Sequence, residues 1–170
     1  MGLKARGSLR RAPFPPLKWS GYLWRGQDDL AAFAKFQLPR VVDQQAEQAV
    51  TIFVAASNGQ SECPPGSEQS RAYQYLLDHQ QHVAAAVSES IVAGYPALRE
   101  SPDAAIELDD LRGLVALTIV HVLPASQDGL AFIGLEFACD WDEARGLGVL
   151  VHGQDVVRIG TAGAAYLPMA

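Results

Sequence analysis

The sequence predicts an α+β domain in which a mainly antiparallel sheet packs against one long helix. Three observations predict this class: one amphipathic helix follows residue 66, strand-like runs lie on both sides of it, and the last of these runs follow one another closely. Strands, then a helix, then a meander of strands is an order typical of α+β folds with the helix on one face of the sheet.

Length and composition indicate a single folded unit after an irregular start. The 170 residues are nearly half apolar and under a fifth charged, which is enough to build one core. Pro13, Pro15 and Pro16 oppose regular strand pairing. We therefore expect a basic N-terminal segment, residues 1–18, that is extended or disordered, and one α+β domain over residues 19–170.

The first half of the domain carries strand signals. Residues 19–24 alternate aromatic and small side chains and predict the first strand, whereas residues 28–38 leave a short helix and an extended segment open. Residues 50–56 form a β-branched run of strand length. Asn58-Gly59 and the following Cys-Pro-Pro-Gly predict a loop.

The helix after this loop has clear signals at both ends. Ser67 can cap it and Glu68 places a negative charge in its first turn. Gly94 and Pro96 predict its end. Apolar residues at steps of three and four form the stripe expected to face the sheet: Tyr73, Leu76, Val83, Val87 and Ile91.

The second half reads as a run of strands. Residues 114–123 are apolar on both faces, which predicts a central strand, and residues 124–129 predict a turn. Residues 130–141 alternate, with one fully apolar face. Leu147–His152 and residues 156–159 flank Gly153-Gln154, a two-residue hairpin turn.

Charge is unevenly distributed. Residues 1–25 hold six basic and no acidic residues, and the remainder is net −12. An acidic body argues against nucleic-acid binding through the folded surface and favours a basic protein partner. No apolar run approaches the roughly 20 residues that cross a bilayer, and no signal peptide is evident. We expect a cytoplasmic protein that does not enter a membrane.

The acidic turn around Trp141 is the candidate site. Calcium binding fails because a calcium loop needs glycine at its sixth position and a carboxylate at its twelfth, where this chain has Arg145 and Val151. A structural interpretation has the carboxylates bonding turn amides while Arg145 neutralises them and Trp141 joins the core. We nominate six residues as a partner-binding surface or motif: Glu136, Asp140, Trp141, Asp142, Glu143 and Arg145.

Other chemistry finds little support. Cys63 and Cys139 lie in unlike settings, so we expect two reduced thiols. His79 and His82 have a spacing that can chelate a metal, but no further ligands complete a set. No nucleotide loop or nucleophile elbow is present. We therefore expect no catalytic, metal or cofactor residues.

The C-terminal block resembles an uncharacterised bacterial domain family. The matching text is Gly134-Leu135-Glu136-Phe137-Ala138-Cys139 and residues 141–149, WDEARGLGV, with an upstream helix that opens Glu68-Gln69. The family pattern has Glu-His where this chain has Ala144-Arg145, which puts any chemistry of that histidine in doubt. The resemblance implies a small binding protein of the kind that serves as the immunity half of a toxin–immunity pair.

The leading hypothesis is therefore a non-enzymatic protein-binding module, such as an immunity protein that neutralises a basic toxin. An alternative is a small enzyme or metal-binding domain that uses Glu136, Asp140, Asp142 and His152 at the strand end around Trp141. A third is a homodimer whose interface lies near residues 19–24.

Overall fold

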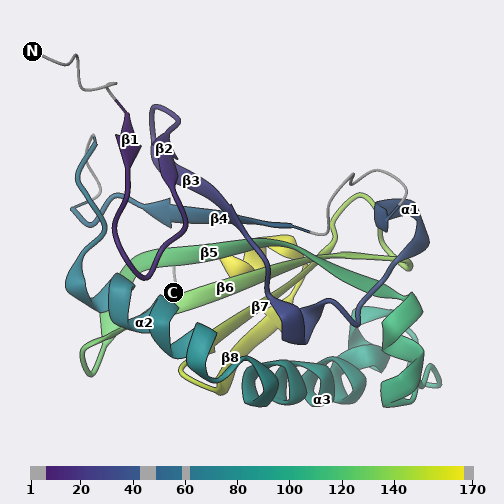
Figure 1. Ribbon diagram of the computed structural model, residues 1–170. Helices are drawn as coiled ribbons and strands as arrows, with labels where there is room; N and C mark the ends of the chain where they lie inside the picture. The colour runs from purple at the N-terminus through teal and green to yellow at the C-terminus, as the bar shows by residue number, and fades with distance from the viewer. Residues whose placement is uncertain (1–6, 43–48, 59–61, 167–170) are drawn as a thin grey trace, which may run out of the picture.

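The computed structural model describes residues 7–42, 49–58 and 62–166, which form an eight-stranded sheet with helices on one face (Figure 1). The strands are β1 (Ser8–Leu9), β2 (Leu17–Trp19), β3 (Leu23–Asp28), β4 (Val50–Ala55), β5 (Val115–Gln127), β6 (Leu130–Cys139), β7 (Leu147–His152) and β8 (Asp155–Gly160). The helices are α1 (Pro39–Val42), α2 (Ser67–Asp78) and α3 (Gln80–Leu98), with 3-10 turns η1 (Ala31–Phe33), η2 (Leu108–Gly113) and η3 (Ala162–Ala165).

The strands lie side by side in sequence order. Every neighbouring pair is antiparallel except β4 and β5, which are parallel. A parallel pair needs a crossover, and α2 and α3 provide it. The prediction of a mainly antiparallel sheet with helical cover is confirmed.

One face of the sheet builds the core. The cross-strand row Ile52, Val120, Leu135, Val149 and Ile159 runs over five strands, and the first four of these side chains have no exposed surface. Alternation along each strand puts these residues on the side that α2 and α3 cover (Figure 1).

The helical stripe expected from the sequence lies in this core. Its five residues are at most 2 % exposed. The hydroxyl of Tyr73 donates a hydrogen bond to Asp28 Oδ2 at 2.6 Å. Burial, followed by this bond and the charge of Asp28, raises the pKa of Tyr73 well above its usual range. Within the described residues, no helix is long and apolar enough to cross a membrane.

The helical region differs from the one long helix that the sequence predicts. His79 has φ −122° and ψ 24°, so two successive helices form there, and its ring Nδ1 lies 3.0 Å from the carbonyl oxygen of Tyr75. Helix α3 continues past Gly94 and includes Pro96. Tyr95 is buried against Trp141, with ring centroids 5.3 Å apart, so tertiary packing holds the last turn in place of a glycine stop.

The N-terminal region also differs. Residues 19–24 span a hairpin, in which Trp19 pairs with Trp24 across a turn where Gly21 has φ +105°. The described part of the predicted N-terminal segment, residues 7–18, packs on the domain through Phe14 and Leu17, which are buried. Residues 1–6, and Gly59 of the predicted loop, lie outside the described residues.

The second face of the sheet is covered in part by η3. Gly134 on β6 pairs with Leu150, and Gly148 on β7 pairs with Glu136, so both glycines lie on this face. A Cβ on Gly134 would overlap the backbone of Ala165. A Cβ on Gly148 would lie 2.5 Å from the carbonyl oxygen of Thr161. The two glycines thus let η3 lie directly against the strands.

Candidate functional site

The six nominated residues lie near the end of β6, one of them on the strand and five in the loop that follows it. Glu136 lies on β6, on the face that η3 partly covers, and the other five belong to the loop between β6 and β7. The loop brings Asp142 and Arg145 together, whereas Trp141 turns toward α3.

Asp142 organises the loop. Its Oδ1 accepts a hydrogen bond from the Arg145 backbone at 3.0 Å, and its Oδ2 lies 2.7 Å from Arg145 Nε. Its carbonyl oxygen accepts the backbone N–H of Gly146, which has φ +63° and so favours glycine. The Asp142 carboxylate therefore bonds a turn amide and pairs with Arg145 at the same time.

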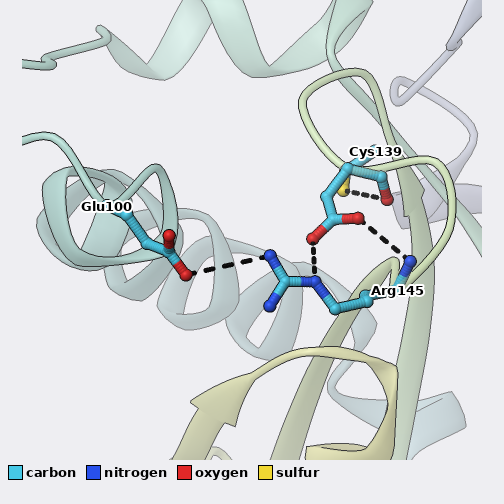
Figure 2. Close-up of polar contacts among 4 residues, drawn as sticks. Glu100, Cys139 and Arg145 are labelled. Atoms are coloured by element: carbon cyan, nitrogen blue, oxygen red, sulfur yellow. Dashed lines mark hydrogen bonds and ion pairs between the residues drawn. The ribbon is translucent and has the colours of Figure 1, made fainter.

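Arg145 connects the loop to the end of α3. Its second guanidinium nitrogen lies 3.8 Å from Glu100, and Figure 2 shows the guanidinium between Glu100 and the loop. Both partners are mostly exposed, so solvent weakens this pair. The contact nevertheless joins two acidic segments that are far apart in the sequence.

Trp141 is half-buried and packs on the core. Its ring meets that of Tyr95 edge-on, and the guanidinium of Arg99 lies 5.8 Å from the Tyr95 ring centre. The tryptophan therefore fixes the last turn of α3 against the loop.

Glu136 takes part in a polar pair that the sequence did not predict. Its Oε2 lies 2.8 Å from His121 Nε2, with the two side chains 24 % and 13 % exposed. The His121 ring also contacts Phe53 and Tyr166. A β-bulge at Thr118, whose hydroxyl donates to the Glu136 carbonyl oxygen, adjusts the strand beside this pair.

A shallow hollow of about 430 Å³ lies beside this pair. Glu136, Glu143 and Arg145 line it together with hydroxyl-bearing residues. The guanidinium of Arg145 is occupied by Asp142 and Glu100, so the hollow offers mainly carboxylates and hydroxyls.

The residues of the enzyme or metal alternative do not form one site. His152 lies at the far end of β7, where its Nε2 is 2.9 Å from the Gln127 carbonyl oxygen, and Glu136 pairs with His121 instead. In the part of the chain that the structure describes, no three His, Cys, Asp or Glu side chains are grouped to hold a metal.

The aromatic surface near residues 19–24, which the homodimer hypothesis needs, is largely used within the domain. Trp24 is buried and its indole donates to the Cys63 carbonyl oxygen at 2.8 Å, while Trp19 packs on Trp24. Tyr22, at 76 % exposure, is the aromatic residue that the hairpin presents to solvent.

Two acidic segments meet at one end of the sheet, which we call the acidic end and define as residues 99–113 and 140–145. The Glu100–Arg145 pair and the hydrogen bond from Asp140 N to Leu114 O join them. It contains three cations, Arg99, Arg112 and Arg145, and eight carboxylates: Glu100, Asp103, Glu107, Asp109, Asp110, Asp140, Asp142 and Glu143.

All of these carboxylates except that of Asp142 belong to exposed residues. The basic strands β1–β3 lie at the opposite corner (Figure 1). Charge is thus separated along the molecule. Both acidic segments are present in the sequence, but only the fold shows that they adjoin.

Comparison with known proteins identifies a family. A family model described as Domain of unknown function (DUF6985) matches residues 33–166, which include β4–β8 and all three helices. No curated protein and no solved structure matches the chain.

Proposed function

The chain belongs to the family of unknown function DUF6985, and from this premise we propose that it is a non-enzymatic protein-binding module that docks a basic partner on its acidic end. The more specific form of the proposal is a bacterial, cytoplasmic immunity protein that neutralises a cognate toxin.

The separation of charge supports this proposal. Eight carboxylates against three cations occupy the acidic end, and the basic residues of β1–β3 lie at the other corner. A patch of one sign steers an oppositely charged partner and can raise the association rate by about 10–1000-fold. Asp142 and Arg145 contact each other and stabilise the loop. The exposed carboxylates of the acidic end are therefore the groups that would contact the partner.

The test is co-expression with a secreted toxin encoded beside this gene. Wild-type protein should protect the cells. The variant Glu100→Gln, Asp103→Asn, Asp140→Asn should bind the toxin about tenfold more slowly, because it loses the steering charge. The association rate can be measured by biolayer interferometry.

A matched control removes the same charge elsewhere. Asp78→Asn, Asp128→Asn, Asp155→Asn alters three exposed carboxylates outside the acidic end. It should bind and protect like wild type. A neighbouring toxin that stays fully lethal beside wild-type protein would overturn the immunity function, and equal slowing by both variants would overturn the role of the acidic end.

A further inference from the structure

The N-terminal strands form a hollow of about 750 Å³ that lies apart from the acidic end. Its polar lining residues are Ser8, Arg10, Lys18, Arg25 and Gln27. The lining includes three cations and no carboxylate. This is the reverse of the charge balance over the rest of the molecule.

Strand register places these cations together. Ser8 pairs with Lys18, and Lys18 pairs with Arg25, so the three side chains follow one another across β1, β2 and β3 on one face. Arg10 follows the end of β1 and lines the same hollow. The sequence shows only that these residues are basic, and the register makes them neighbours.

The strand register places two positive charges, those of Lys18 and Arg25, opposite each other. Like charges directly opposite on neighbouring strands repel, and their Cβ atoms are roughly 5 Å apart. Over residues 7–42, 49–58 and 62–166, none of the ion pairs found involves Arg10, Lys18 or Arg25. An anion bound between them would relieve this repulsion.

The backbone beneath the hollow is fixed. The segment that leads into β2 packs directly on Gly26 of β3. A Cβ on Gly26 would lie 2.9 Å from the Pro16 carbonyl oxygen and 2.9 Å from the Leu17 side chain. Leu17 is 1 % exposed and anchors this segment in the core. Lys18 and Arg25 therefore project from a packed backbone, so binding has to order only their side chains.

We propose that this hollow is a binding site for phosphate-bearing ligands. A carboxylate carries one charge and would neutralise one of the three cations. A terminal phosphate carries a charge of about −1.5 to −2, so two linked phosphates carry enough negative charge to neutralise all three cations. The two arginines can also donate paired N–H groups to phosphate oxygens.

The site is independent of the proposed docking function. It lies at the opposite corner of the sheet, on strands that precede the residues matched by the family model. A variant of this hollow should therefore leave the acidic end and toxin binding unchanged, so the two proposals fail separately.

The experiment measures binding of inorganic tripolyphosphate to the full chain by isothermal titration calorimetry at low salt. Wild type should bind one equivalent, more weakly as salt is added. Arg10→Gln, Lys18→Gln, Arg25→Gln should bind about tenfold more weakly or not at all, as loss of charged hydrogen bonds implies. The control Lys35→Gln, Arg99→Gln, Arg112→Gln removes the same charge elsewhere and should bind like wild type.

A second measurement needs no ligand. Lys18→Gln alone should raise the melting temperature of the free protein, because it removes one of two opposed charges. Equal binding by both triple variants, or a lower melting temperature for Lys18→Gln, would overturn the site.

Further arms identify the source of the phosphate. Vesicles that contain a phosphoinositide, compared with phosphatidylcholine vesicles, test a lipid headgroup, and free tripolyphosphate tests a soluble ligand. Tighter binding to a single-stranded oligonucleotide than to tripolyphosphate, with no loss in the hollow variant, would overturn the proposal in favour of nucleic-acid binding elsewhere.

Discussion

Two glycines on adjacent strands, Gly134 and Gly148, decide how closely η3 approaches the sheet. A side chain on either Gly134 or Gly148 would meet the backbone of residues 161–165. We expect Gly134→Ala and Gly148→Ala each to lower the free energy of unfolding by about 1–3 kcal/mol, the usual cost of overpacking. Urea unfolding measures this change.

Gly113 supplies the control. It is exposed at the end of η2, and an added Cβ would meet no atom within 4 Å. Gly113→Ala should change stability by no more than about 0.5 kcal/mol. Similar losses in all three variants would mean that close approach of η3 is not the cause.

Among the elements, α2 is tied to the sheet by one buried amide. Gln69 is 2 % exposed, and its side chain donates to the carbonyl oxygens of Ala55 and Val122 while accepting the N–H of Gly66. It thus bridges β4 and β5 at the parallel pair. Gln69→Leu should cost about 2 kcal/mol or more, because buried backbone groups lose their partners.

Gln74 on the same helix is the matched position. Its amide bonds Asp78 in an exposed setting, so Gln74→Leu should stay within about 0.5 kcal/mol of wild type in the same urea experiment. A Gln69→Leu protein as stable as Gln74→Leu would show that the bridge contributes nothing.

Local sequence patterns predicted the helices and strands better than the side-chain contacts between them. A β-branched run predicted β4, alternation predicted β6, and the turn at Gly153-Gln154 predicted β7 and β8. The three- and four-residue steps predicted the buried face of the helices. The break at His79 and the turn at Gly21 depend on single backbone conformations that periodicity does not record. The Glu136–His121 and Glu100–Arg145 contacts depend on strand register and helix position, so the composition of the candidate site could not be read from spacing alone.

At the scale of the whole molecule, residues 14–17 of the N-terminal region belong to the core. Phe14 stacks on Tyr73 with ring centroids 5.0 Å apart, and Leu17 is almost fully buried. A chain that begins at Trp19 should lose about 5 kcal/mol of stability or more, since truncating one buried Phe or Leu costs about 2–5 kcal/mol. Thermal and urea unfolding of the shortened chain check this expectation.

Point variants in the intact chain separate lost packing from lost length. Leu17→Ala should be destabilised by about 2–5 kcal/mol, whereas Ser8→Ala, on an exposed position of β1, should be nearly neutral. A shortened chain as stable as the full one would place the domain boundary at residue 19.

The parallel pairing of β4 with β5 divides the sheet into two meanders. Within each meander most strands meet their neighbours through short connections, so closing those loops costs little entropy. Thr51 and Ile119 meet only after the whole helical crossover is in place. Pairing of β4 with β5 is therefore the step that we expect to be slow in folding. Until these strands pair, each meander exposes an unpaired strand edge, and the chain is most prone to aggregate there.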